Sequence, residues 1–416
     1  MLRIAKKMQR KAPAIGGKKM KDYQQMKEKI LEAVKQNLPE LIALNDDLAD
    51  HPEVSGKEKE TSRKIVELLR SKGFEVEYPF AGFDYAFKGV HGKNNHKYKI
   101  AILTEYDALP ELGHACGHCV SGSISVLAGI AMSGLQDELD ADIHVIGTPQ
   151  EETEGAKTVM CLDGVFDNYD MAMMIHLYDQ NLIYCNLFGL ISWQYDFYGK
   201  AAHAAAAPWE GRNALNGAQL MMHAVDMMRQ HVTPDVRLHG IYKKAGVVPG
   251  IVPEEASIHL YLRALDNDNL KDVLRRAADC AKGAAMATQT TVDIHRVELD
   301  YDSLKRNPAG ESAIREAYEE LGIDINGDHS MIFGSSDIGN VSFKCPAFHS
   351  TLQIVDKGIA IHTKEFEEAV KTPRAHEAIE KGAEIIALSI TKIFSDENRI
   401  AAMKADFKKK QSELNK

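Results

Sequence analysis

The sequence has no run of eighteen or more apolar residues, the length that a membrane-spanning helix requires. We therefore expect no transmembrane segment and no membrane partner. Positive charge is also in short supply, because 50 Lys and Arg face 60 Asp and Glu, a formal net charge of −10. Proteins that bind nucleic acid through surface charge normally have the opposite balance, which argues against this class.

Cysteine is scarce, with six residues in 416. Cys116 and Cys119 lie three positions apart, and the others are scattered along the chain. Disulfide-stapled folds are short and dense in cysteine, so this pattern argues against such a framework. We expect reduced thiols and therefore a cytoplasmic protein. The scattered cysteines are Cys161, Cys185, Cys280 and Cys345.

Acidic residues are missing from the first nineteen positions, which carry seven Lys and Arg. This segment also lacks the apolar stretch of a secretory signal and the serine enrichment of a transit peptide. We predict that residues 1–19 are a disordered basic arm, or an extension ahead of a start at Met20. At the other end, the charged residues 401–416 are predicted to form a frayed tail.

The rest of the chain is longer than one hydrophobic core usually serves, which predicts two domains. Short apolar runs at 99–104, 142–147 and 170–175 are separated by segments with helical spacing. This order predicts an α/β domain with a mixed, mostly parallel sheet flanked by helices. Helical spacing over 23–48 predicts an N-terminal helix that Pro39 breaks or restarts.

A different pattern occupies residues 188–302, where strand, helix, two strands, helix and strand follow one another. That order predicts a compact, ferredoxin-like α+β unit. Since helix and strand patterns of the first kind return afterwards, we predict that this unit is inserted into the larger domain. The larger domain then comprises residues 20–187 and 303–400.

A cysteine and a histidine with one residue between them, Cys116 and His118, lie in a glycine-rich loop. Gly113 and Gly117 allow the backbone to turn tightly, so that a thiolate and an imidazole reach one metal centre. A structural cysteine beside an unrelated histidine would give the same pattern. The pair therefore suggests a metal site without establishing one.

Two adjacent carboxylates, Glu151 and Glu152, follow the apolar run at 142–147. Because neighbouring side chains point in different directions, one can bind metal while the other accepts a proton from water. A solvated acidic turn is the structural alternative. Asp107 follows the run at 99–104, where a carboxylate can orient a metal-binding histidine or simply cap a turn.

His176 ends the third apolar run, and His362 precedes a predicted helix. Either is compatible with a buried core histidine. Taken jointly with the thiol and the carboxylates, they form a set of soft and borderline ligands that suits zinc, with manganese or cobalt as substitutes. The five predicted metal ligands are Cys116, His118, Glu152, His176 and His362.

Two residues of the inserted unit are candidates for substrate contact. His203 is surrounded by small residues, which leaves room for a substrate whose oxyanion the imidazole would stabilise. Arg263 lies on a predicted inner strand and suits a bidentate pair with a substrate carboxylate. A surface ion pair is the alternative for Arg263.

Together these motifs resemble the metallohydrolase family of aminoacylases, carnosinase-type dipeptidases and glutamate-releasing carboxypeptidases. Within it, the chain is most similar to amidohydrolases related to p-aminobenzoyl-glutamate hydrolase, β-alanyl-lysine-type dipeptidases and indole-acetyl-amino-acid hydrolases. The similarity covers roughly residues 25–395. The matching segments are HPEVSGKE, EYDALPELGHACGH, GTPQEETEGAK, IHLY, GKAAHAAAAPWEGRNAL, VVPGIVPEEA, FGSSDIGNVS and AIHTKEF.

The resemblance implies a catalytic domain with two divalent metal ions, zinc or manganese, and an inserted dimerisation domain that makes a homodimer. By motif, the five ligands named above match metal ligands and Glu151 matches the general base. His203 matches a histidine that reaches the neighbouring subunit's active site. Asp107 is expected to be a third catalytic residue, in addition to Glu151 and His203.

The implied reaction is hydrolysis of an amide bond that releases an amino acid from a dipeptide or an N-acyl-amino acid. A p-aminobenzoyl-glutamate-type amidohydrolase is the alternative substrate class. A thiol hydrolase with Cys116 as nucleophile and His118 as base is an alternative mechanism. An idle, small-molecule-binding dimer is an alternative of another kind, which the retained Glu151 argues against.

Three departures from the family pattern stand out. Cys119 occupies a position where the family usually has Asn or Asp, so a ligand-orienting partner is missing or the thiol is an extra ligand. Thr153 and Glu154 replace the usual glycines after the glutamate pair. Gly250 replaces a common Asn in the turn at 248–253.

Overall fold

Continuous apolar runs form the centre of a six-stranded sheet in the computed structural model, which describes residues 23–414. The sheet order is β1-β2-β4-β3-β5-β10. β3 pairs in parallel with β4 and β5, and β5 with β10, whereas β2 is antiparallel to both of its neighbours. The mixed, mostly parallel sheet that the sequence predicted is thus confirmed. The strands are β1 (Phe74–Glu77), β2 (Phe87–His91), β3 (Tyr98–Thr104), β4 (Ala141–Gly147), β5 (Met171–Tyr178) and β10 (Ala347–Gln353).

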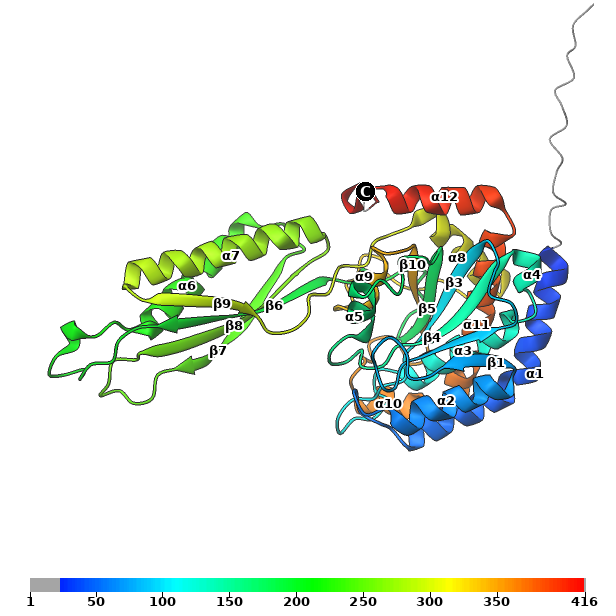
Figure 1. The fold of residues 1–416 in the computed structure, drawn as a ribbon, viewed down its shortest axis with the longest axis horizontal. Coiled ribbons are helices and arrows are strands. Elements are labelled where there is room, and N and C mark those ends of the chain that lie inside the picture. Colours follow the sequence, from blue (N-terminus) through cyan, green and yellow to red (C-terminus); the bar gives the residue numbers. More distant parts are fainter. Residues whose placement is uncertain (1–22, 415–416) are drawn as a thin grey trace, which may run out of the picture.

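Helices cover this sheet and complete the first lobe (Figure 1). The central one is α3 (His118–Met132), whose fifteen residues are all buried, as expected for a helix that is apolar on every side. A Cβ at Gly129 would lie 2.2 Å from Cγ2 of Val145, so glycine there permits α3 to approach β4. The other helices are α1 (Tyr23–Asp50), α2 (Lys59–Ser71), α4 (Gln136–Leu139), α5 (Ala156–Leu162), α8 (Pro308–Glu320), α9 (Ile338–Val341), α10 (Lys364–Ala369), α11 (Pro373–Phe394), α12 (Glu397–Lys408) and α13 (Gln411–Leu414).

The second lobe is a four-stranded antiparallel sheet of order β7-β8-β6-β9 with two helices packed on it. Figure 1 shows both helices on the same face of the sheet. This is the predicted ferredoxin-like arrangement of an α+β unit. Its elements are β6 (Gly189–Tyr198), α6 (Ala214–Met228), β7 (Arg237–Ala245), β8 (Glu255–Ala264), α7 (Asn267–Thr288) and β9 (Thr291–Arg296), with 3₁₀ turns at Pro208–Glu210 and Arg229–His231.

Two sequence-based expectations about helices were wrong. α1 continues through Pro39 without a break, because Leu41 and other apolar residues on its buried side are fully packed in the core. The segment after Ile400 is not frayed, since α12 runs to Lys408 and buries Met403 completely. The predicted basic arm at 1–19 lies outside the described residues.

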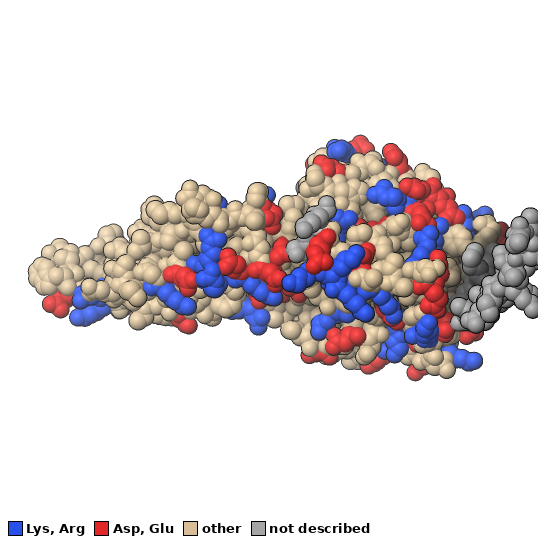
Figure 2. Space-filling view, turned by 90° about the horizontal axis from the view of Figure 1, so that it is seen from above, with Lys and Arg blue, Asp and Glu red and all other residues tan. Residues whose placement is uncertain are grey.

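No helix between residues 23 and 414 is long and apolar enough to cross a membrane. The two lobes meet where Leu190, at the start of β6, pairs with Tyr301. Charged side chains gather over the first lobe and this junction, whereas the far part of the second lobe is mostly uncharged on the face that Figure 2 shows.

Candidate active site

A cavity lies at the carboxyl ends of β4 and β5, at the boundary of the two lobes, where open α/β sheets usually bind ligands. Its volume is about 400 Å³. The walls carry thiol, imidazole and carboxylate groups from the first lobe and a guanidinium group from the second. The predicted site residues that line the cavity are Cys116, Glu151, Glu152, His176, Arg263 and His362.

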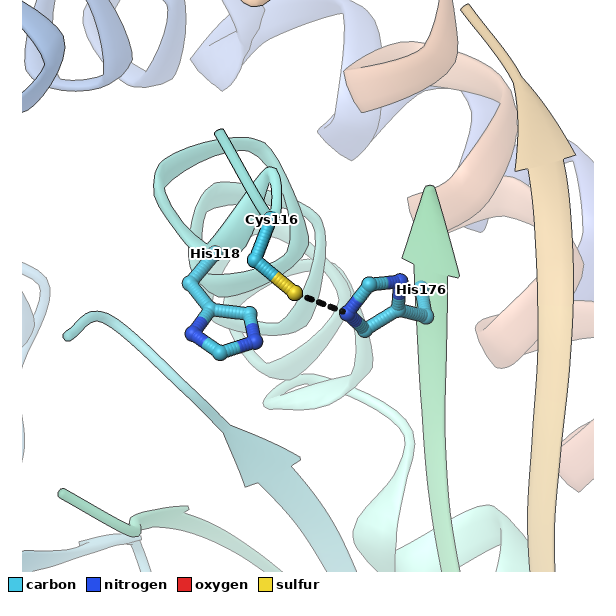
Figure 3. Close-up of side chains that lie close together, drawn as sticks. All are labelled: Cys116, His118 and His176. Carbon is cyan, nitrogen blue, oxygen red and sulfur yellow. Dashed lines mark hydrogen bonds between the residues drawn. The ribbon is translucent and has the colours of Figure 1, made fainter. Parts of the chain in front are cut away.

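The loop before α3 turns tightly because two glycines adopt left-handed backbone angles, with φ of 61° at Gly113 and 83° at Gly117. A Cβ at Gly117 would lie 3.1 Å from a side-chain carbon of β5. A larger residue would therefore be strained both by the positive φ and by this close contact. This turn directs Cys116 and His118 toward His176 on β5 (Figure 3). Sγ of Cys116 lies 3.5 Å from Nε2 of His176.

All five predicted metal ligands come together around this loop. Together with Glu151, they form three groups of donor atoms, and within each group all atoms lie within 4.8 Å of one another. Two groups share the thiol of Cys116, so one sulfur reaches both. Sulfur, nitrogen and oxygen donors at this spacing fit a divalent metal of zinc type. The groups are Cys116 with His118 and His176, Cys116 with Glu152 and His362, and His118 with Glu151 and Glu152.

Asp107 fixes two of these ligands at once. Its Oδ1 lies 2.9 Å from Nδ1 of His118, and its Oδ2 accepts a hydrogen bond of 3.0 Å from the backbone N of Glu152. Because Asp107 occupies Nδ1 of His118, Nε2 is the ring nitrogen that can bind a metal ion. That nitrogen is buried and has no hydrogen bond within residues 23–414, which fits a metal-binding atom.

The backbone conformation of His362 sets the position of its imidazole ring. Its φ of 63° is unusual for a residue with a side chain, and such strain is often found at functional sites. The backbone N of His362 donates to the carbonyl of Ala115 at 2.8 Å. The ring then lies 3.4 Å from Glu152, measured from Nε2 to Oε1. The loop at 360–363 is thereby tied to the loop that carries the thiol.

The carboxylate of Glu151 belongs to two groups of neighbouring donor atoms, one with His118 and Glu152 and the other with Glu105 and Asp337. Burial raises the pKa of its carboxyl well above the usual range, and the charges of Glu105 and Asp337 act in the same direction. A carboxylate with a raised pKa is a better proton acceptor. The hydroxyl of Tyr301, in the segment that joins the lobes, lies 3.5 Å from the Glu151 carbonyl oxygen.

The two predicted residues of the second lobe differ in their placement. Arg263 lines the cavity and donates from Nη1 to Oγ of Ser335 at 2.8 Å, a bond between the lobes. His203 is exposed and lies beyond β6, whose start at Leu190 is close to the junction. At about 3.3 Å per strand residue, His203 is on the order of 25 Å or more from the cavity of its own chain. The structure does not bring His203 to the cluster.

Cys119, the first departure from the family pattern, packs away from the ligands. Its side chain is fully buried in the core beside α1 and α11, and burial raises the pKa of its thiol to about 12. It takes no part in the ligand groups found among the described residues. The second departure leaves the turn intact, because Gly155 supplies the positive φ after the exposed Thr153 and Glu154.

Several buried polar residues at the site were not singled out from the sequence. Glu105, Lys157 and Asp337 form a charged group beside Glu151. All three lie in segments that match the family, which was the available signal. His349 lines the cavity and its ring stacks on His176 with 5.5 Å between centroids. Its strand, β10, was not predicted as an element.

Known proteins share both the sequence and the fold. A sequence model described as a peptidase dimerisation domain matches residues 186–288. The Xaa-Arg dipeptidase of Mus musculus is 34% identical over 322 residues, or 76% of this chain and 74% of that protein. A p-aminobenzoyl-glutamate hydrolase polypeptide of Escherichia coli is 25% identical over 88% of this chain and 91% of that protein.

A solved structure extends the similarity to the whole fold. It is that of a Bacillus subtilis dinuclear metal-binding peptidase from the M20 family, with a TM-score of 0.69 and 17% sequence identity. The similarity covers 86% of this chain and 99% of that structure. The resemblance inferred from the motifs is therefore confirmed. By the identity and coverage of its mouse relative, the protein belongs to the M20 family of peptidases and metal-dependent amide hydrolases.

Proposed function

We propose that the protein releases an amino acid from a dipeptide or an N-acyl-amino acid by hydrolysing the amide bond between them. One observation carries the proposal. Five side chains of the types that bind zinc, and a sixth side chain, the carboxylate of Glu151, come together in or beside one cavity. A structural metal site would not need this additional carboxylate.

The cluster is proposed to hold two divalent ions, zinc or manganese, with cobalt as a substitute. The ligands would be Cys116, which belongs to two donor groups, with His118, Glu152, His176 and His362. The pair would supply the Lewis acidity that polarises the amide carbonyl and makes water more acidic. Asp107 orients His118 and the Glu152 backbone and so keeps the ligands in place.

Proton transfer is assigned to Glu151. Its carboxylate accepts a proton from the attacking water and passes it to the departing amine. Arg263, which lines the same cavity, is proposed to bind the substrate carboxylate. His203 is assigned to the active site of a second copy of the chain, where its imidazole would stabilise the oxyanion.

A homodimer is proposed to complete the site. Support comes from the match of residues 186–288 to a peptidase dimerisation domain and from the distance of His203 to its own cavity. We assign residues 188–302 to the dimerisation unit and residues 20–187 with 303–400 to the catalytic unit. The free cysteines among the described residues support a reducing compartment such as the cytoplasm.

A dipeptide is the first choice of substrate, since the mouse relative is an Xaa-Arg dipeptidase. A second cavity, which shares Glu151, Glu152 and Arg263 with the first, is also lined by Glu154 and Glu298. Positive and negative side chains in one cavity suit a substrate with both a carboxylate and a cationic side chain. The E. coli relative belongs to a p-aminobenzoyl-glutamate hydrolase, which makes an acyl-glutamate the second choice.

The experiment is a hydrolysis screen over dipeptides, N-acyl-amino acids and p-aminobenzoyl-glutamate with zinc, manganese or cobalt added. Glu151→Gln should bind metal at the wild-type level and lose at least about a hundredfold in kcat. Glu75→Gln, at an exposed position on β1, is the control and should keep wild-type activity. A wild-type protein that hydrolyses none of these substrates would favour the idle binding dimer instead.

A further inference from the structure

Lys157 is the only lysine among the described residues whose side chain is completely buried. It is the second residue of α5, and its ammonium group contacts two carboxylates. Nζ lies 2.5 Å from Oδ1 of Asp337 and 2.7 Å from Oε1 of Glu105. The backbone N of Lys157 also donates to Oδ2 of Asp337 at 3.0 Å. Both carboxylates are themselves buried.

These contacts connect three distant segments of the first lobe. Glu105 follows β3, Lys157 lies in the first turn of α5, and Asp337 immediately precedes α9. Breaking such a buried pair leaves an uncompensated charge, whereas replacing it by apolar residues is often neutral for stability. The burial of Lys157 between two carboxylates therefore does not by itself indicate that it stabilises the fold. Its presence calls for a functional explanation.

The position of Glu151 supplies that reason. Carboxylate oxygens of Glu105, Glu151 and Asp337 lie within 4.8 Å of one another. Three carboxylates this close repel one another unless a cation lies among them. The ammonium of Lys157 is that cation, and it comes from the helix that directly follows the Glu151 loop. On its other side, Oε2 of Glu105 lies 3.5 Å from Nε2 of His118.

We propose that Lys157 is a positioning residue for the reaction: its ammonium group holds the carboxylates of Glu105 and Asp337 around Glu151 and so fixes the proton acceptor beside the ligand cluster. The inference rests on the proposed function, because it takes Glu151 as the proton acceptor. Lys157 itself lines neither of the two cavities that contain Glu151, so it acts through its neighbours and not on the substrate.

The test compares Lys157→Met with the wild-type protein, both loaded with zinc. Methionine keeps an unbranched side chain, one heavy atom shorter than that of lysine, and removes its charge. We expect kcat to fall about a hundredfold, the typical cost of misplacing a catalytic group by about 1 Å. KM should stay within about threefold and the bound zinc per chain should not change, because no proposed substrate or metal ligand is altered. Lys344→Met, which removes a partly exposed partner of Asp167 in the same lobe, is the control and should leave kcat unchanged.

A double variant separates positioning from folding. In Lys157→Met/Asp337→Asn the net charge of the group returns to its wild-type value. We expect kcat about tenfold above the single variant yet below wild type, because Glu105 still has no ammonium to hold it. A Lys157→Met protein that folds, binds zinc and has wild-type kcat would overturn the inference. Zinc loss in proportion to lost activity would also overturn it.

If Lys157→Met does not fold, Asp337→Asn alone decides. Asparagine has the same shape and can still accept from the backbone of Lys157, so this variant should fold. About a tenfold loss in kcat with unchanged zinc content supports positioning, and wild-type kcat refutes it. The Glu151→Gln variant separates a failure of the proposed function from a failure of the role proposed for Lys157. Wild-type turnover in Glu151→Gln would refute the proposed function, whereas an inactive Glu151→Gln beside a fully active Lys157→Met would refute only the role of Lys157.

Discussion

The two lobes differ in what they bury. The first lobe encloses charged groups beside the cavity, including Glu105, Lys157 and Asp337, each at most 1% exposed. Among the described residues, the second lobe buries no charged side chain, and an apolar cluster forms its core. Buried charge is costly unless it is paired, so its concentration beside the cavity of one lobe supports placing the proposed reaction there. The second lobe can contribute to that chemistry only through its surface.

Several large apolar side chains are exposed on the surface of the second lobe. Trp209, Val247 and Met286 are 71%, 88% and 83% exposed, and Figure 2 shows how little charge the far part of this lobe carries on one face. Exposed apolar residues in such number are typical of surfaces that contact another protein. The contrast therefore separates a lobe that would bind metal from a lobe that would bind a second copy and deliver His203.

Metal removal should have the largest effect, because it acts on the first lobe directly. Treatment with a chelator should lower activity by more than about a hundredfold, beyond the loss caused by removing a single ligand-orienting partner. Zinc, manganese or cobalt should restore it. Burial raises the pKa of the Cys116 thiol well above its usual range, which disfavours a free thiolate nucleophile in the absence of metal. Activity that survives metal removal but is lost on thiol alkylation would establish the thiol mechanism instead.

Replacing His203 tests whether the second lobe takes part in the reaction. His203→Ala should lower kcat about a hundredfold, as for the loss of an oxyanion donor, without changing the unfolding temperature, since the side chain is exposed. His295→Ala, at an exposed position on β9, is the control. Both measurements need only purified protein, a substrate from the screen and a thermal melt.

Mixing variants sharpens the same comparison. His203→Ala and Glu151→Gln should each be inactive, yet their hybrid dimers contain one site with both residues intact. Random pairing after dissociation should restore about a quarter of wild-type activity. No recovery in verified hybrids would show that His203 does not act in the partner's site.

The smallest effect is expected for Arg263, which connects the second lobe to the cavity of its own chain. Arg263→Lys removes the planar fork but keeps the charge, so KM should rise about tenfold while kcat changes little. A substrate whose terminal carboxylate is amidated should be insensitive to the change. Arg296→Lys, on the surface of β9, is the control. An equal loss on the amidated substrate would assign Arg263 to holding the lobes together.

The sequence predicted features that depend on neighbouring residues better than features that depend on contacts between residues far apart in the chain. Local spacing predicted most strands and long helices, because apolar periodicity reflects which side of an element is buried. It failed at Pro39, where long-range packing keeps α1 continuous, and after Ile400, where α8 and α11 cover α12. It also missed β10, whose pairing with β5 is fixed by contacts far apart in sequence.

By itself the sequence determined the kinds of chemistry available: a thiol, histidines and paired carboxylates in a fixed order along an α/β chain. Only the tertiary structure decided which of them meet. It brought donor atoms from distant segments into groups whose members lie within 4.8 Å of one another, kept Cys119 in the core and placed Lys157 between two carboxylates. The reason is physical. Residue type sets what a side chain can donate or accept, whereas distance and burial, which set the strength of these interactions, arise only when the strands assemble into a sheet.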